Sequence, residues 1–149
     1  IYKIKKRGLN KPFIILVSSI KDLNIFGIKI NEKTAEMLKK YWPGKVSVIL
    51  PCKEKSFFYL HRGTNTLAFR LPDKKELINI LKMTGPLVAP SANPEGEKPA
   101  STISEAKKYF GDSIDFYLNE GKLKSLPSTL IKIKNGKIDV LRKGAVDIG

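Results

Sequence analysis

Apolar residues are grouped along the chain in short blocks, a pattern that predicts strands separated by helices and turns. Two continuous runs, Phe13 to Val17 and Val46 to Leu50, are rich in β-branched residues and typical of buried strands. A third block alternates from Thr66 to Leu71 and stops at a proline. Shorter strands are predicted at Leu87 to Ala89, Ser128 to Ile133 and Lys137 to Leu141, the last two joined by an Asn135-Gly136 hairpin turn.

The alternating block fixes the direction of one charged side chain. Successive residues of a strand point to opposite faces of the sheet, so Arg70 is expected to point away from Leu67 and Phe69.

A helical pattern occurs three times between these strands. Each of these helical segments begins at a residue that can cap the first turn and ends near glycine or proline. The first places Ala35, Leu38 and Trp42 on one face, and the second opens with a capping box from Asp73 to Glu76. The predicted helices run from Asn31 to Trp42, from Asp73 to Met83 and from Thr102 to Phe110. We therefore expect one mixed α/β domain over residues 1–149, with a twisted, mostly mixed sheet flanked by helices.

Composition excludes several classes of protein. At 149 residues and 42% hydrophobic, the chain can bury a core of its own. No apolar run approaches the roughly 20 residues of a membrane span. The single cysteine, Cys52, excludes an internal disulfide and a cysteine-rich zinc site, and it favours the cytoplasm. Because the chain begins with Ile1, a fragment is a further expectation.

The formal net charge of +14 has two interpretations. An excess of cations can mark a polyanionic partner, either a nucleotide or a nucleic acid. Alternatively, the lysines solvate the surface and have no specific partner. Arginine is scarce, at positions 7, 62, 70 and 142. Three of the four are predicted at strand starts or ends, where a planar bidentate donor can be placed precisely.

The standard catalytic motifs are missing from the sequence. His61 is the sole histidine, and its place in His61-Arg62-Gly63 favours an exposed loop over a catalytic triad. The sequence contains no Walker loop or dinucleotide-binding glycine motif, and its acidic residues show no paired pattern.

Basic and small polar residues remain as candidates for chemistry. If Lys5-Lys6-Arg7 is extended, Lys5 and Arg7 share a face and could clamp a phosphate; the alternative is an exposed basic strand edge. Ser91 and Asn93 lie between two prolines, where they could hold a nucleotide phosphate or ribose, or could form a turn with their own backbone.

Six motifs in this order resemble the YrdC-type domain, the threonylcarbamoyl-AMP synthase family. The resemblance covers essentially the whole chain. Its motifs are Lys5-Lys6-Arg7 with Lys11-Pro12, Tyr41-Trp42-Pro43-Gly44-Lys45-Val46-Ser47, Thr66-Leu67-Ala68-Phe69-Arg70-Leu71-Pro72, Ala89-Pro90-Ser91-Ala92-Asn93, Ser128-Thr129-Leu130-Ile131 and Leu141-Arg142-Lys143-Gly144.

The sequence also departs from the family pattern. The family domain is longer at its N-terminus, where a threonine-rich segment helps to hold threonine, so the resemblance implies an N-terminally truncated domain. Lys45 and Ser47 replace a proline and a threonine, Leu16 stands where some members have histidine, and Pro99 stands where some have a nucleotide-binding serine.

The resemblance implies a YrdC-like fold with a basic concave cleft. It also implies a nucleotidyl transfer that joins L-threonine, bicarbonate and ATP into threonylcarbamoyl-AMP and releases pyrophosphate, with Mg²⁺ accompanying ATP. The product serves the threonylcarbamoyl-transferase machinery that modifies adenosine 37 of tRNA. The residues implied for ATP are Lys5, Arg7, Lys11, Thr66, Ser91, Asn93 and Arg142, and those implied for threonine or its carbamate are Arg70, Ala89 and Ser128. Lys5 and Arg7 are the implied catalytic residues, because they would stabilise the charge that develops in the transition state.

Two other functions stay open from the sequence. A basic α/β domain could bind double-stranded RNA or tRNA through backbone charge, and such binding would weaken steeply with salt. A paralogue that binds nucleotide without turnover is the other alternative.

Overall fold

The computed structural model describes residues 1–123, 126–134 and 136–148. Contacts divide the chain into two compact units. Unit 1 comprises Ile1–Lys11 and Pro90–Ser125, and unit 2 comprises Pro12–Ala89 and Leu126–Gly149. The sheet and the main apolar core belong to unit 2.

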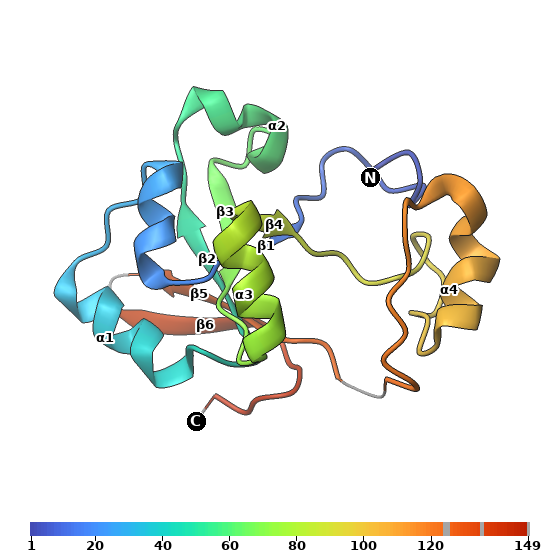
Figure 1. Cartoon of the computed structure of the whole chain (residues 1–149). Coiled ribbons are helices and arrows are strands. Elements are labelled where there is room, and N and C mark those ends of the chain that lie inside the picture. Colours follow the sequence, from blue (N-terminus) through green and yellow to red (C-terminus); the bar gives the residue numbers. More distant parts are fainter. Residues whose placement is uncertain (124–125, 135, 149) are drawn as a thin grey trace. The chain divides into compact units, whose positions relative to one another are not determined.

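Unit 2 is built on a six-stranded mixed sheet (Figure 1). The strand order is β4-β1-β3-β2-β5-β6. Strand β1 pairs with β3, and β2 with β5, in parallel, whereas the β1–β4, β2–β3 and β5–β6 pairs are antiparallel. The strands are β1 (Ile14–Leu16), β2 (Val46–Pro51), β3 (Thr66–Arg70), β4 (Leu87–Val88), β5 (Thr129–Lys134) and β6 (Lys137–Arg142).

Alternation along the strands separates an apolar face from a more polar face. The side chains of Val48, Phe69 and Ile131 are fully buried in one apolar cluster. Residues next to them in the same strands, such as Ser47 beside Val48 and Arg70 beside Phe69, point the other way because side chains alternate along a strand. The predicted direction of Arg70, away from Phe69, is consistent with this arrangement.

Helical segments also contribute side chains to this apolar cluster. Leu23 and Phe26 enter it from η1, and Leu38 from α1; the Phe26 ring meets Phe69 edge-on, with centroids 5.0 Å apart. Trp42 is buried just beyond α1, where its indole nitrogen donates to Val46 O at 2.8 Å. The helical segments of unit 2 are η1 (Ile20–Phe26), α1 (Glu32–Tyr41), η2 (Lys55–Phe57), α2 (Phe58–His61) and α3 (Lys75–Thr84), the η elements being 3-10 helices.

Unit 1 has a single α-helix among the residues that the structure describes, α4 (Ile103–Phe110), followed by η3 (Gly111–Ser113). Thr102 caps α4 as predicted, with its hydroxyl accepting from Glu105 N at 3.2 Å. The remainder of unit 1 consists of turns and extended chain.

The predicted mixed α/β class, the strands and the three longer helices are confirmed. The capping box predicted at Asp73 is wrong, because α3 begins at Lys75. Its N-cap is Lys74, which makes no side-chain capping hydrogen bond. The predicted hairpin turn includes Asn135, which lies outside the described residues. Within the described parts of the chain, no helix combines the length and the apolar character required to span a bilayer.

His61 is buried, in contrast to the exposed loop position predicted for it. It closes the short helix α2, is 2% exposed, and accepts from Gly63 N at Nδ1 (3.1 Å). The Phe58 ring packs against it edge-on, with centroids 5.6 Å apart. The sequence pattern failed here because a four-residue helix is too short to show periodicity.

A carboxylate organises the chain directly after β1. Asp22 accepts hydrogen bonds from the backbone N–H and the hydroxyl of both Ser18 and Ser19, at 2.7 to 3.2 Å. Burial raises the pKa of Asp22, and these hydrogen bonds outweigh that effect and bring the pKa below its ordinary value.

The Asp22→Asn variant is expected to be less stable at neutral pH by about 1–2 kcal/mol, because the charged acceptor of these bonds is lost. A carboxyl with a depressed folded pKa stabilises above its unfolded pKa and loses that contribution as pH falls through the folded value. The difference from wild type should therefore shrink below about pH 4. Urea unfolding across pH tests this, with Asp147→Asn at an exposed position as the control; a difference that stays constant down to pH 2 would contradict the role of the charge.

Candidate functional site

The segment that carries Lys5 and Arg7 is a turn, so the extended conformation considered for it is wrong, and so is the alternative of an exposed strand edge. Residues 2–6 coil back on themselves through bonds from Lys5 N to Ile1 O and from Arg7 N to Tyr2 O, at 2.9 and 3.0 Å. Lys6 closes the turn in the left-handed region, with φ of 50°. Lys5 and Arg7 are brought close by the turn rather than by strand alternation.

Lys5 is the buried cation of unit 1. It is 5% exposed, and its ammonium donates to two main-chain carbonyls, Ser91 O and Asn93 O. Burial lowers the pKa of Lys5, and the Arg7 charge lowers it further, whereas Glu95 opposes both. Because an ammonium has three donors, this arrangement can fix Lys5 to the Ser91–Asn93 loop and still offer a proton to a ligand.

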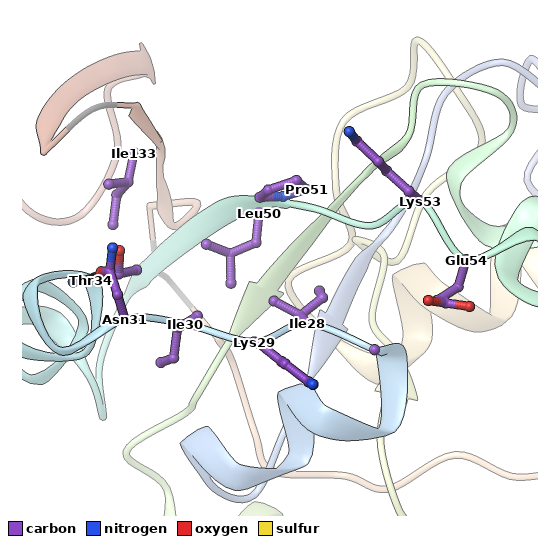
Figure 2. A pocket seen from close by; sticks show the side chains of 11 residues that line it. Ile28, Lys29, Ile30, Asn31, Thr34, Leu50, Pro51, Lys53, Glu54 and Ile133 are labelled. Atoms are coloured by element: carbon purple, nitrogen blue, oxygen red, sulfur yellow. Dashed lines mark hydrogen bonds between the residues drawn. The ribbon is translucent and has the colours of Figure 1, made fainter.

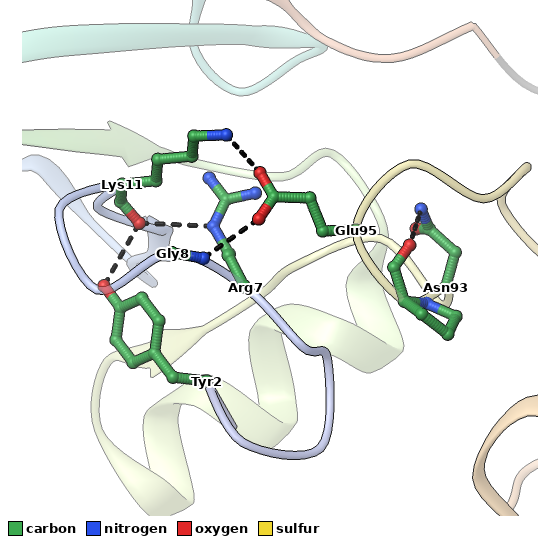
Figure 3. A network of polar contacts seen from close by, with 7 residues as sticks. Tyr2, Arg7, Gly8, Lys11, Asn93 and Glu95 are labelled. Carbon is green, nitrogen blue, oxygen red and sulfur yellow. Dashed lines mark hydrogen bonds and ion pairs between the residues drawn. The ribbon is translucent and has the colours of Figure 1, made fainter.

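Arg7 and Lys11 lie beside this loop with Glu95 (Figure 3). Arg7 Nε donates to Lys11 O at 3.2 Å, and Tyr2 Oη donates to the same carbonyl at 3.1 Å. Lys11 forms an ion pair with Glu95. We call Lys5, Arg7 and Lys11 the cationic cluster; all three belong to unit 1.

Asn93 supports its own loop. Its Nδ2 donates to Pro94 O at 2.9 Å and to Glu97 O at 2.7 Å, so the local-turn alternative describes its amide group correctly. Its Oδ1 is buried and has no hydrogen-bond partner among the residues that the structure describes. Ser91 is exposed on the same loop, beside the carbonyl that binds Lys5.

A second set of candidate residues lies on one face of the sheet in unit 2. The antiparallel register pairs Val48 with Phe69, so Ser47 and Arg70 point together to the opposite face. Arg70 is partly buried, and its Nε donates to Gly44 O at 2.8 Å. Burial lowers the pKa of Arg70, and Asp73 acts against that effect. A desolvated guanidinium bonded to a neutral carbonyl favours an anionic ligand.

A β-bulge adds Arg142 to this face. The β5–β6 register shifts between Leu130 and Ile131, and Arg142 rather than Leu141 lies opposite Leu130. The Arg142 guanidinium then donates to Ser128 O at 2.8 Å and to its hydroxyl at 3.3 Å. Ser128 Oγ is in turn 2.8 Å from Ser47 Oγ. We call Arg70, Ser47, Ser128 and Arg142 the sheet-face row.

Gly144 keeps the chain after Arg142 close to Ser128. A Cβ at this position would lie 2.3 Å from Pro127 O and 2.6 Å from the carbonyl carbon of Ser128. The close approach is fixed by Ala145 N, which donates to Pro127 O at 2.9 Å. Only glycine allows this contact, which explains the Arg142-Lys143-Gly144 motif in physical terms.

Two further predicted residues also belong to unit 2. Thr66 begins β3, on the same face as Arg70 but about 13 Å away along the strand, at about 3.3 Å per residue. Ala89 follows β4, and its N–H donates to Ile14 O at 2.9 Å. The structure thus groups the predicted residues as Lys5, Arg7, Lys11, Ser91 and Asn93 in unit 1 and Thr66, Arg70, Ala89, Ser128 and Arg142 in unit 2.

A pocket of about 420 Å³ lies elsewhere in unit 2 (Figure 2). It is lined by the segment from Gly27 to Asn31 and by the end of β2, with Ile28, Ile30 and Leu50 contributing apolar side chains. None of the predicted site residues lines this pocket.

Sequence reasoning missed Ser47 and Glu95 as members of the candidate site. Ser47 is fully buried, and its only signal was a hydroxyl in an otherwise apolar strand. Glu95 contacts Lys11 and Gly8 across 84 and 87 positions of sequence. Such long-range contacts leave no local pattern.

A family model described as Sua5_yciO_yrdC, telomere recombination, matches residues 1–144. The chain belongs to this family. Among its curated relatives, a putative threonylcarbamoyl-AMP synthase from Methanocaldococcus jannaschii is 32% identical over 149 residues, covering 99% of this chain and 70% of that protein. A threonylcarbamoyl-AMP synthase from Bacillus subtilis is 35% identical over 107 residues, covering 70% of this chain and 31% of that protein.

Solved structures agree with the family assignment. Pyrococcus abyssi Sua5 in complex with L-threonine matches with a TM-score of 0.85 and 26% identity, over 96% of this chain and 43% of that one. Escherichia coli YciO shares the fold, with a TM-score of 0.82 at 22% identity, over 99% of this chain and 72% of that one. The chain spans less than half the length of the Pyrococcus and Bacillus proteins.

Proposed function

We propose that the chain is an L-threonylcarbamoyladenylate synthase that acts in tRNA threonylcarbamoyladenosine biosynthesis. The observation that carries the proposal is the buried Lys5, fixed to the Ser91–Asn93 loop with Arg7 and Lys11 beside it. Burial of a cation costs free energy, and binding an anionic ligand offsets that cost. Relatives named threonylcarbamoyl-AMP synthase support the same substrate class.

The reaction begins with the carbamate that L-threonine forms with bicarbonate. A carbamate oxygen attacks the α-phosphorus of ATP, the bond to the β-phosphate oxygen breaks, and pyrophosphate leaves with the electron pair. No covalent enzyme intermediate is needed, so positioning and charge stabilisation supply the catalysis.

Roles follow from the chemistry of each set. The cationic cluster would bind the triphosphate, with Lys5 and Arg7 countering the charge that develops on the leaving pyrophosphate. Ser91 and Asn93 would hold the nucleotide from the loop, and Thr66 and Arg142 from the sheet. The threonine carboxylate or the carbamate would meet Arg70 and Ser128, on the polar face of the sheet, and Ala89, directly after β4.

Mg²⁺ would enter with ATP. Among the described residues, no group of three or more His, Cys, Asp or Glu side chains could hold a metal ion. Mg²⁺ in phosphate sites keeps several waters and needs one or two protein oxygens at most, so the residues fit a metal carried by the triphosphate. Bound in that way, it would neutralise phosphate charge.

Mass spectrometry of the products tests the proposal. The purified chain with ATP, L-threonine and bicarbonate should form threonylcarbamoyl-AMP, and carbon-13 bicarbonate should transfer its label to the product. Omission of threonine or bicarbonate is the control. Release of pyrophosphate that is independent of threonine, with no adenylate formed, would refute the proposal.

A further inference from the structure

Glu95 places a carboxylate at the cationic cluster of unit 1. Its Oε2 accepts from Gly8 N at 2.9 Å, and its Oε1 pairs with the Lys11 ammonium. Figure 3 shows the Arg7 guanidinium beside the same carboxylate. The two oxygens of Glu95 therefore engage a backbone N–H and an ammonium, with a guanidinium adjacent.

This donor set is one that binds phosphate. Backbone N–H groups, ammonium and guanidinium groups are the usual donors to phosphate oxygens. The two Glu95 carboxylate oxygens accept hydrogen bonds from Gly8 N and Lys11 Nζ, as two phosphate oxygens in the same place would. The main chain of Glu95 holds the carboxylate there, because Glu95 N donates to Lys5 O at 2.7 Å.

The surroundings of Glu95 favour its charged form. The hydrogen bonds from Lys11 and Gly8 lower the pKa of Glu95 by more than burial raises it, and the Lys11 and Arg7 charges add smaller lowering effects. The carboxylate also opposes the lowering of the Lys5 pKa, so it balances part of the charge of the whole cluster.

We propose that the Glu95 carboxylate competes with polyphosphate for the cationic cluster. It binds the cluster when no ligand is present, and the phosphates of ATP displace it. The inference rests on the proposed function for the identity of the natural ligand. The carboxylate would weaken polyphosphate binding and speed the release of pyrophosphate by returning to Gly8 and Lys11 as the product leaves.

Calorimetric titration with inorganic tripolyphosphate tests the competition without requiring turnover. Glu95→Gln keeps the shape and an acceptor for Gly8 N–H but removes the charge. Its affinity for tripolyphosphate is expected to rise about five- to tenfold, the difference between a charged and a neutral hydrogen-bonding partner. Glu97→Gln, at an exposed position of the same loop with the same change in net charge, should stay within about twofold of wild type.

Steady-state kinetics provides a second measurement. The KM for ATP should fall in Glu95→Gln, while kcat stays level or falls because pyrophosphate leaves more slowly. Unchanged or weaker tripolyphosphate binding in Glu95→Gln would overturn the inference, the weaker result showing that Glu95 builds the loop instead.

Failure of the inference and failure of the proposed function give different results. If wild type forms threonylcarbamoyl-AMP and Glu95→Gln binds tripolyphosphate no more tightly, the inference alone fails. If Glu95→Gln binds more tightly but no adenylate forms, the competition stands and the proposed reaction fails. If neither protein binds tripolyphosphate, the cationic cluster is not a polyphosphate site and the inference fails.

Discussion

The Arg7→Ala variant is expected to release pyrophosphate in the presence of threonine about 10²–10³ times more slowly than wild type, the usual loss when a preorganised donor to developing charge is removed. Arg7 is held by its Nε bond to Lys11 O, so its position is set before a substrate arrives. A guanidinium placed in this way loses little entropy when it binds a phosphate. The measurement is initial-rate pyrophosphate release with and without L-threonine.

Lys3→Ala is the matched control for this variant. Lys3 is exposed on the same N-terminal turn and carries the same charge. Its removal should change the rate by less than about threefold, since an exposed charge is screened by solvent and salt. Circular dichroism of both variants should match wild type. Near-normal activity in Arg7→Ala would exclude the catalytic role of Arg7. An equal loss of activity in Lys3→Ala would mean that only the net positive charge of the turn matters, not the position of Arg7.

The sheet could be predicted because its signals are local. Continuous apolar runs identified β1 and β2, and the alternation of Thr66 to Leu71 gave both β3 and the direction of Arg70. A continuous apolar run and a period of two residues are both signals that a short segment can display. The order of the strands had no such signal and came from the structure.

The sequence named candidate site residues, but it did not reveal how the structure arranges them. The bulge that turns Arg142 toward Ser128 depends on pairing between β5 and β6, and nothing in Leu141-Arg142 reveals it. An extended conformation was considered for Lys5-Lys6-Arg7, yet Lys5 lies in a turn and is buried against carbonyls that lie 86 and 88 residues away. Contacts made across such distances are decided by tertiary packing, which overrides a local pattern of charges.

The structure shows which of the cations behind the net charge of +14 are buried or bonded to the protein. Lys5 is the one lysine buried among the residues that the structure describes. Arg70 is partly buried, and Arg142 is bonded to Ser128. The described cations that are held by buried or partly buried contacts are therefore few.

The Lys5→Met variant is expected to lose activity by about 10²–10³-fold, as in Arg7→Ala, and also to loosen the Ser91–Asn93 loop. Methionine keeps most of the side-chain length but leaves Ser91 O and Asn93 O without the ammonium. Leaving a buried acceptor unpaired costs about 1–3 kcal/mol. Amide hydrogen exchange in the loop, at Asn93 N and Glu95 N, should therefore be faster in Lys5→Met and unchanged in Arg7→Ala.

Lys6→Met separates these effects from a change in net charge. Lys6 is exposed in the same turn, and the substitution removes the same charge from a side chain of similar length. It should leave both loop exchange and activity close to wild type. Loss of activity in Lys5→Met without faster loop exchange would mean that Lys5 acts through its charge alone. Full activity would mean that the buried ammonium is a structural support, and that Arg7 and Lys11 bind the phosphates without it.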